Sequence, residues 1–518
     1  MGQKSNPVKI WGLPWHSLFF ALYPVLALLG HNIGETYIDS AYRALIVSTI
    51  GSLVLLAITY SVLRDWQKAG LVTTWLLVFF FSYGHIYTFL KTLEIPATIV
   101  IRHRYLAPVL FVVFGLAIWW GLKQPTHLPS TTSTLNIISI VLLVYPIYQL
   151  AAFGIVNNAS VRNPNDENSY GAHLPAEGAP PDIYYIILDS YGRQSTLQKV
   201  LQYNNEPFLD TLASMGFYIA DCSRSNYPRT TLSLASSLNF DYLPALSSEI
   251  RPENTDLHPL AKLMKDSAIQ RVLDSLGYKT IAFETGYYWS QMEDYDIYLR
   301  PTPGAYSALN GFESMLLRTS ALSILDDMGI FKDKMPLSDN ALVYERTLFA
   351  LAKLEQLPSV PGPKFVFAHL LIPHTPFVFG PDGEFLVVPK STRPGVDYER
   401  EDYFHGYHNQ LVYTDKRIPE TLAKIIAESP TPPVIIVQGD HGPGLVEGND
   451  RLGILNAYHL PGNPSGLSKS ITPVNTFRIV LNTYFGTHLD LLPDISYIPS
   501  NYHKPYDFIE VPDNCSIP

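Results

Sequence analysis

In two short stretches of this 518-residue chain, an apolar run is followed closely by an acidic side chain, and in one of them also by a histidine. The run at 434–437 leads, through a Gln-Gly pair, to Asp440 and His441, and the run at 183–188 leads to Asp189. Such runs are typical of parallel strands buried on both faces, whose carboxyl ends collect ligands. Two carboxylates with one imidazole suit a single divalent ion, Zn²⁺, Mn²⁺, Mg²⁺ or Ca²⁺. The alternative is structural, because an aspartate at a strand end often caps the next helix.

A third stretch, Ser225-Asn226-Tyr-Pro228-Arg-Thr230, predicts the start of a helix. Proline is favoured in the first turn of a helix, and serine and asparagine are favoured as caps before it. Because a helix N-terminus attracts anions, a phosphate or sulfate group would be stabilised there beside the metal. A hydroxyl in this position, with its proton loosened by the metal, would act as nucleophile. The structural alternative is an ordinary capped helix.

Histidine and aromatic residues after two other apolar runs are further candidates. His374 lies between two prolines in a rigid turn, where it would bind an anionic oxygen or protonate a leaving group. His369 lies inside the preceding strand, and we expect it to be a core residue. Trp289, together with Tyr287 and Tyr288, either lines a substrate pocket or anchors a surface loop.

Strand-like and helical patterns alternate through the second part of the chain. Strand-like runs lie at 183–188, 217–220, 280–283, 365–372 and 434–437. Helical patterns lie near 206–215, 228–239, 259–275, 340–356, 401–428 and 473–485. This alternation predicts an α/β domain with a mainly parallel sheet flanked by helices. The carboxyl ends of such strands would bring the candidate metal ligands together.

The first 155 residues carry the apolar excess of a chain that is 47% hydrophobic and 16% charged. Five apolar runs lie near 13–30, 42–63, 70–90, 105–122 and 135–154. Each is close to the roughly 20 residues that a helix needs to cross a bilayer, and none has the polar stripe of a soluble helix. We therefore expect a bundle of about five transmembrane helices. With the N-terminus inside, five spans would place the rest of the chain outside the cytoplasm, although the distribution of Lys and Arg does not settle the orientation.

The composition also bounds the domains and the partners. We expect a transmembrane domain at 1–156, a linker at 157–181 that is rich in Asn, Pro, Gly and Ala, and an extracytoplasmic domain at 182–518. The net charge of −10 and the absence of a basic stripe argue against nucleic acid as a partner. The chain has two cysteines, Cys222 and Cys515, and in an oxidising compartment these could form a disulfide.

In this order, the four elements resemble the alkaline phosphatase/sulfatase superfamily over residues 182–490. The resemblance is greatest to its membrane-anchored branch, which includes lipoteichoic acid synthases and phosphoethanolamine transferases. Asp189 matches the acidic metal ligand at the end of the first strand, and Asp440 and His441 match the Asp-His-Gly of the last catalytic strand. His374 matches a His-x-Pro turn. Tyr413-Thr-Asp415 also looks like a family feature, of structural kind.

The resemblance implies a metal-dependent hydrolase or phospho-group transferase that acts on a lipid or glycan outside the plasma (inner) membrane. It implies one divalent metal ion, because the family's second metal cluster has no match between 284 and 340. The substrate, and whether the group moves to water or to an acceptor, stay open. Arg193, Ser225 and Trp289 are the candidates for substrate binding.

One departure from the family pattern concerns the nucleophile. Asn226 aligns where sulfatases carry cysteine and membrane transferases carry threonine, which excludes the formylglycine of true sulfatases. An amide oxygen can ligate a metal but is not a useful nucleophile. Thr230 lies one helical turn beyond Asn226 and should face the same way, so we expect it to supply the hydroxyl. The alternative is a catalytically inactive sulfatase-fold membrane protein that binds an anionic lipid or an envelope partner.

Overall fold

The structure is a computed structural model of the chain. It describes residues 12–33, 38–92, 103–123, 128–158, 170–175, 178–301, 309–327, 339–386, 400–444, 446, 448–462, 464–501, 503–512 and 515. The chain forms two compact units, one of residues 1–161 and 305–339 and the other of residues 162–304 and 340–518. Most of the expected linker at 157–181 lies outside the described residues.

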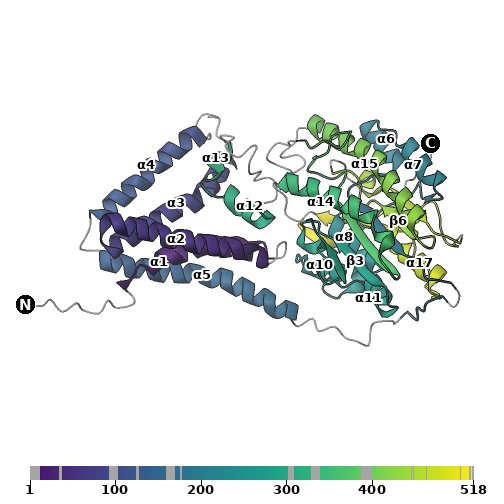
Figure 1. Ribbon diagram of the computed structural model, residues 1–518, viewed down its shortest axis with the longest axis horizontal. Helices are drawn as coiled ribbons and strands as arrows, with labels where there is room; N and C mark the ends of the chain where they lie inside the picture. The colour runs from purple at the N-terminus through teal and green to yellow at the C-terminus, as the bar shows by residue number, and fades with distance from the viewer. Residues whose placement is uncertain are drawn as a thin grey trace, which may run out of the picture. The chain divides into compact units, whose positions relative to one another are not determined.

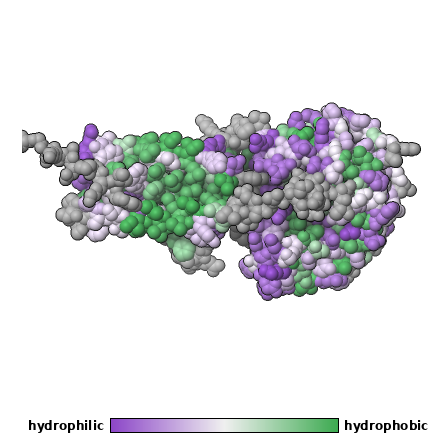
Figure 2. All heavy atoms as spheres, turned by 90° about the horizontal axis from the view of Figure 1, so that it is seen from below, coloured by the Kyte–Doolittle hydropathy of each residue, from purple (hydrophilic) through white to green (hydrophobic). Residues whose placement is uncertain are grey.

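The first unit is helical (Figure 1). Its long helices are α1 (Trp15–His31), α2 (Tyr42–Leu63), α3 (Trp66–Thr92), α4 (His103–Leu122) and α5 (Leu128–Asn158). Four of the described helices, α2 to α5, are long and apolar enough to cross a membrane, and α1 is a shorter apolar helix of 17 residues. Figure 2 shows a broad hydrophobic surface on this unit. Exposed apolar side chains on this scale mark a membrane-facing surface, as the sequence predicts.

A segment from the second half of the chain belongs to this helical unit. It contains α12 (Gly311–Arg318) and α13 (Ser323–Asp327). Helix α12 begins with a capping box, in which Asn310 and Glu313 exchange hydrogen bonds between side chain and backbone. Glu313 also forms an ion pair with Arg43 of α2. The segment is therefore joined to the apolar helices by specific polar contacts.

The second unit is built around a mixed sheet. Its strands are β1 (Ile183–Leu188), β2 (Tyr218–Ile219), β3 (Lys279–Phe283), β4 (Ile297–Leu299), β5 (Lys364–Leu370), β6 (Val434–Gln438) and β7 (Asn456–His459). Their order is β2-β7-β6-β1-β5-β3-β4. Strand β7 is antiparallel to both of its neighbours, and every other neighbouring pair is parallel. The prediction of an α/β domain with a mainly parallel sheet is confirmed.

Helices cover both faces of this sheet. The larger ones are α6 (Gln194–Leu201), α7 (Glu206–Ser214), α8 (Thr230–Leu238), α10 (His258–Lys265), α11 (Ala268–Ser275), α14 (Asp339–Leu354), α15 (Arg400–Glu428) and α17 (Thr476–Tyr484). The short helix α16 (Asn449–Leu452) precedes β7, and a hairpin of β8 (Ser496–Asn501) and β9 (Lys504–Val511) follows α17. Alternate side chains of β1 enter two separate cores. One core receives α8, α10, α11 and α17, and the other receives α6, α7, α14 and α15.

The centre of the sheet positions the candidate site. Strand β1 lies between β6 and β5, and in this register Ile187 is opposite both Gln438 and His369. The residues that follow β1 and β6 therefore emerge side by side at one edge of the sheet. Ser190, immediately after Asp189, has a positive φ of 71°. A non-glycine residue in this conformation is strained and is characteristic of functional sites.

Candidate metal centre and active site

Three buried side chains converge at the carboxyl ends of the central strands. Asp189 follows β1, His369 lies on β5 and Asp440 follows β6. One ligand atom from each lies within 4.8 Å of the others, and within the described residues this is the one group of His, Cys, Asp and Glu side chains arranged in this way. The predicted pairing of Asp189 and Asp440 is therefore present. His369, which we expected in the core, joins them, because β5 is the other neighbour of β1.

The hydrogen bonds of the two carboxylates test whether a cation fits. Asp440 Oδ1 accepts the backbone N–H groups of Ser190 and His441, each at 2.9 Å. Asp189 Oδ2 lies 3.2 Å from Nε2 of His369. The other oxygens, Asp189 Oδ1 and Asp440 Oδ2, are buried and have no hydrogen-bond partner among the described residues. Because bare buried carboxylate oxygens are costly, this donor set fits a divalent cation.

His441 turns a ring nitrogen toward these two bare oxygens. Its Nε2 lies 3.8 Å from Asp189 Oδ1 and 3.5 Å from Asp440 Oδ2. Its Nδ1 lies 2.9 Å from the carbonyl oxygen of Gly442, and a proton donated there leaves the Nε2 lone pair available. Burial, and next the Arg451 guanidinium, lowers the pKa of His441 to about 4. The neutral imidazole is the form that binds metal.

Thr230 and Arg451 contact the same nitrogen of His441. Thr230 is the first residue of α8, and its Oγ1 lies 3.2 Å from His441 Nε2. Arg451, from α16, places Nη2 3.3 Å from His441 Nε2 and donates through Nη1 to the carbonyl oxygen of Gly442. A hydroxyl, a guanidinium and the N-terminus of a helix therefore meet beside the bare carboxylate oxygens.

Asn226 is not brought to this cluster, contrary to the expectation that it would be a metal ligand. Its Nδ2 donates to the carbonyl oxygen of Ile495 at 2.8 Å and to Thr472 Oγ1 at 3.0 Å. Its Oδ1 accepts the backbone N–H of Val474 at 2.9 Å. The amide thus joins the start of α8 to the segment that leads into and follows α17. Since both polar atoms of the side chain are already occupied, we no longer consider Asn226 a ligand.

His374 and Trp289 lie beside the cluster. The rings of His374 and His441 are 6.2 Å apart, centroid to centroid, and His374 is half-buried. Its backbone carbonyl accepts a hydrogen bond from Gln410 of α15, which fixes the turn. The ring of Trp289 lies 5.7 Å from that of His369. Both rings therefore lie next to histidines of the cluster.

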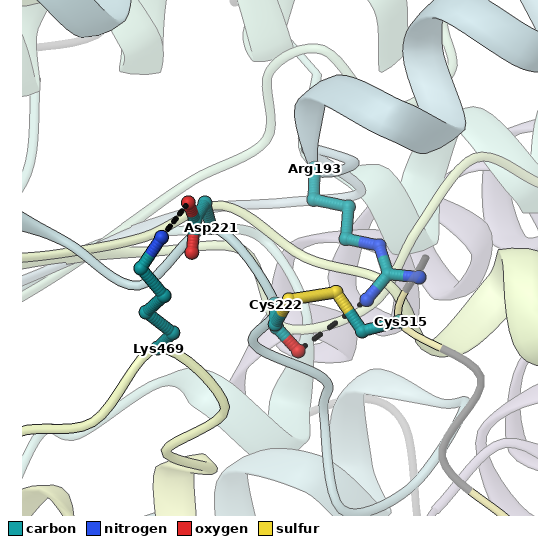
Figure 3. Close-up of a disulfide and its surroundings, with 5 residues drawn as sticks. All are labelled: Arg193, Asp221, Cys222, Lys469 and Cys515. Carbon is teal, nitrogen blue, oxygen red and sulfur yellow. Dashed lines mark hydrogen bonds and ion pairs between the residues drawn. A yellow bond between two sulfur atoms is a disulfide. The ribbon is translucent and has the colours of Figure 1, made fainter. Parts of the chain in front are cut away.

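Arg193 and Ser225, the other expected substrate-binding residues, have backbone partners instead. Arg193 donates through Nη1 to the carbonyl oxygen of Cys222 at 3.3 Å, beside a disulfide (Figure 3). The backbone N–H of Ser225 donates to the carbonyl oxygen of Leu452 at 2.8 Å. These contacts hold the loop before α8 in place.

The disulfide in Figure 3 joins Cys222 to Cys515, with a Cα–Cα distance of 5.6 Å. The pairing that the sequence suggested is therefore present. An ion pair of Asp221 and Lys469 lies next to it, with 3.3 Å between the charged atoms. The C-terminal end of the chain is thus attached to the loop that leads into α8.

A second layer of hydrogen bonds supports the turn after β1. Asp415 of α15 accepts from the hydroxyls of Tyr191 and Tyr203, at 2.6 and 2.7 Å. The hydroxyl of Tyr407 donates to the carbonyl oxygen of Ser190 at 2.7 Å. Burial raises the pKa of Asp415 to about 7, although both tyrosine hydrogen bonds lower it. Asp415 thus has a structural position behind the site.

Two residues of the cluster were missed from the sequence. His369 carried a usable signal, because a histidine inside an apolar strand next to β1 reaches the ligand end of the sheet, but this requires the strand order. Arg451 carried no signal in the sequence. It lies in the short helix α16, after the loop that follows Asp440, and this segment belongs to no recognised motif.

Comparison with known proteins shows the family of this chain. The model of the Sulfatase family matches residues 181–479, which is more than half of the chain. The chain therefore belongs to the Sulfatase family. No curated protein sequence matched it.

Solved structures that are similar to this chain include three bacterial proteins. The C-terminal periplasmic domain of EcEptC from Escherichia coli is 13% identical, with a TM-score of 0.41, covering 64% of this chain and 92% of that one. The lipoteichoic acid synthase LtaP from Listeria monocytogenes is 16% identical, with a TM-score of 0.39, covering 65% and 83%. The integral membrane protein lipooligosaccharide phosphoethanolamine transferase A (EptA) from Neisseria meningitidis is 13% identical, with a TM-score of 0.36, covering 91% and 94%.

Proposed function

We propose that this protein is a membrane-anchored, metal-dependent transferase or hydrolase of phospho- or sulfo-esters on an extracytoplasmic lipid or glycan. The observation that carries the proposal is the position of the Thr230 hydroxyl, 3.2 Å from His441 Nε2. That nitrogen faces the two bare carboxylate oxygens of Asp189 and Asp440. A hydroxyl beside a metal site and at a helix N-terminus is the arrangement that nucleophilic transfer requires.

In this proposal Asp189, Asp440 and His441 hold one divalent ion, Zn²⁺, Mn²⁺, Mg²⁺ or Ca²⁺. When bound, the ion supplies positive charge that lowers the pKa of a nearby hydroxyl and stabilises the charge of the transition state. Buried His369 holds Asp189 in place through its contact with Oδ2. The protein contributes a fixed geometry, so that no reorganisation is needed when charge develops.

The reaction itself would take place on Thr230. The Thr230 hydroxyl first gives its proton to solvent, and its oxygen then forms a bond to the phosphorus or sulfur of the ester while the bond to the leaving oxygen breaks. His374 donates a proton to that leaving oxygen. Water or an acceptor hydroxyl then takes the group from Thr230 in a second displacement, in which the attacking hydroxyl gives its proton to His374 and the leaving Thr230 oxygen regains a proton from solvent. The N–H groups at the start of α8 hold the anionic oxygens during both steps.

The cysteines and the apolar helices support the proposed location. Both cysteines of the chain are joined in a disulfide, so the formylglycine of true sulfatases, which is made from a cysteine or serine in the family motif, has no cysteine to form from. Disulfides persist in oxidising compartments, which favours the outer side of the plasma (inner) membrane for this unit. The four helices α2 to α5 would anchor it there.

A second candidate function is a catalytically silent protein that binds an anionic lipid or an envelope partner. Asn226, at the position where the family carries its nucleophile, favours it. The two candidates differ in whether a covalent intermediate can form.

The experiment that separates them uses purified full-length protein reconstituted with Zn²⁺ or Mn²⁺ and incubated with bis(4-nitrophenyl) phosphate. Under the proposal, mass spectrometry finds a phospho-adduct on Thr230, and Thr230→Ala abolishes it while the metal content stays the same. Thr231→Ala, one residue further along α8, is the matched control and should retain the adduct. Full metal content with neither turnover nor adduct in the wild type would favour the silent protein.

A further inference from the structure

The guanidinium of Arg451 joins the two loops of the site. Its Nε donates to the carbonyl oxygen of Pro228 at 3.1 Å, and its Nη1 donates to that of Gly442 at 2.9 Å. Pro228 lies just before the helix that begins with Thr230, and Gly442 follows the metal-binding pair. The residue is only partly exposed. Two backbone carbonyls therefore fix the orientation of the Arg451 guanidinium.

The Nη2 group of Arg451 contacts a nitrogen of His441 that a bound metal would occupy. Nη2 lies 3.3 Å from His441 Nε2, the nitrogen that faces the two bare carboxylate oxygens. When a cation occupies that lone pair, Nη2 loses its acceptor while Nε and Nη1 keep theirs. An arginine N–H without an acceptor in a half-buried site is unfavourable, and an anionic oxygen is its preferred replacement.

The charges of the cluster point the same way. The carboxylates of Asp189 and Asp440 balance one divalent ion, and Arg451 then adds one positive charge. His441 does not add to this charge, since its neutral form binds metal. Because Thr230 Oγ1 and Arg451 Nη2 contact the same nitrogen, one phosphoryl or sulfuryl group can reach both. Arginine is the side chain best suited to hold such a group.

We propose that Arg451 binds a nonbridging oxygen of the ester group that is transferred to Thr230. This inference rests on the proposed function for its reaction, but not for its anion site. Arg451 would hold the group in line for attack and offset the negative charge that develops on it.

The test compares Arg451→Gln and Arg451→Lys with the wild type, all as full-length protein loaded with Zn²⁺. Arg478→Gln is the matched control, since Arg478 also donates to two backbone carbonyls, those of Phe240 and Asp490, in the core around α17. The first readout does not depend on turnover. It is the rise in unfolding temperature that inorganic phosphate causes, together with the metal content of each variant.

We expect phosphate to stabilise the wild type and Arg478→Gln but not Arg451→Gln, with equal metal in all three. Arg451→Lys, which keeps the charge but not the planar fork, should recover part of the effect. With bis(4-nitrophenyl) phosphate, kcat/KM of Arg451→Gln should fall by about 10²-fold, as for the loss of one transition-state donor.

Two results would overturn the inference. One is phosphate stabilisation of Arg451→Gln equal to that of the wild type, or no stabilisation of the wild type itself. The other is loss of metal from Arg451→Gln, which would make the residue a structural support of the ligand loop. Phosphate protection that depends on Arg451 in a protein without turnover would instead retain the anion site and reject the proposed function.

Discussion

The hydroxyl of Thr230 lies 3.2 Å from Nε2 of His441, across 211 residues of sequence. One residue starts a helix and the other follows the strand next to β1. Their contact places a hydroxyl beside the candidate metal ligands, whereas the Asn226 amide is bonded to other segments. The consequences of this arrangement can be measured.

Replacing Thr230 should separate nucleophilic catalysis from metal binding. Thr230→Ala should lower kcat/KM for a phosphodiester by about 10³-fold or more, because the attacking oxygen is lost. Thr230→Ser keeps the hydroxyl and should retain a substantial part of the activity. Steady-state kinetics with bis(4-nitrophenyl) phosphate measures both. Equal activity of Thr230→Ala and the wild type would exclude Thr230 as nucleophile.

Removal of the metal should destabilise the fold as well as abolish activity. Asp189 Oδ1 and Asp440 Oδ2 would face each other without compensation, and a ligand at 100 times its Kd contributes about 2.7 kcal/mol. A chelator should therefore lower the unfolding temperature of the wild type. Asp440→Asn should bind less metal and respond less to the chelator. Asp450→Asn, in the exposed pair with Lys199, is the control and should behave like the wild type.

His369→Leu tests whether this histidine belongs to the site or only to the core. A leucine fills a similar volume in an apolar strand, so a core role predicts little change. If His369 holds Asp189 or binds the ion itself, metal affinity should fall by about 10- to 100-fold. Metal titration followed by calorimetry gives the affinity. Unchanged metal affinity in His369→Leu would show that His369 is only a core residue.

The pKa of Asp415 gives a pH dependence with a defined sign. Burial raises the pKa of Asp415 from 3.8 to about 7, so the folded state favours the neutral acid. Its contribution to stability is complete below pH 4 and is lost as the pH rises through 7, by about 4 kcal/mol in total.

Thermal unfolding of the full-length protein between pH 5 and pH 8.5 would detect this loss. Asp415→Asn, which stays neutral, should show a weaker fall in stability over that range. Asp382→Asn removes an exposed carboxylate, paired with Lys416, and should keep the slope of the wild type. An unchanged slope in Asp415→Asn would contradict the assignment.

The buried ion pair of Lys364 and Asp182 predicts a stability change away from the chemistry. The pair lies at the starts of β5 and β1, with 2.5 Å between Nζ and Oδ2 and both side chains almost fully buried. Lys364→Met leaves the carboxylate unpaired and should cost about 3–5 kcal/mol. The double variant Lys364→Met with Asp182→Leu should recover most of that loss. Chemical denaturation measures the difference, and a double variant as unstable as the single one would argue against this account.

The sequence determined the parts of the site that follow from local patterns. An apolar run that ends in a polar residue marks a buried strand and its ligand end, and this identified Asp189, Asp440 and His441. Pro228 marked the approach to α8, although it lies before the helix and not in its first turn as predicted. Thr230 was the candidate hydroxyl. The apolar helices follow from composition alone, because a membrane-crossing helix needs no tertiary partner to be recognised.

Only the tertiary structure decided which side chains meet. His369 enters the cluster because β5 lies next to β1, and strand order is not encoded in any local period. Asn226 is not part of the cluster, because residues between 472 and 495 form hydrogen bonds with its amide. Arg451 and the segment of α12 are placed by contacts with residues more than two hundred positions away. The local sequence pattern indicates which side of a helix or strand is buried. Long-range packing determines which residues come into contact, and the chemistry of this site depends on those contacts.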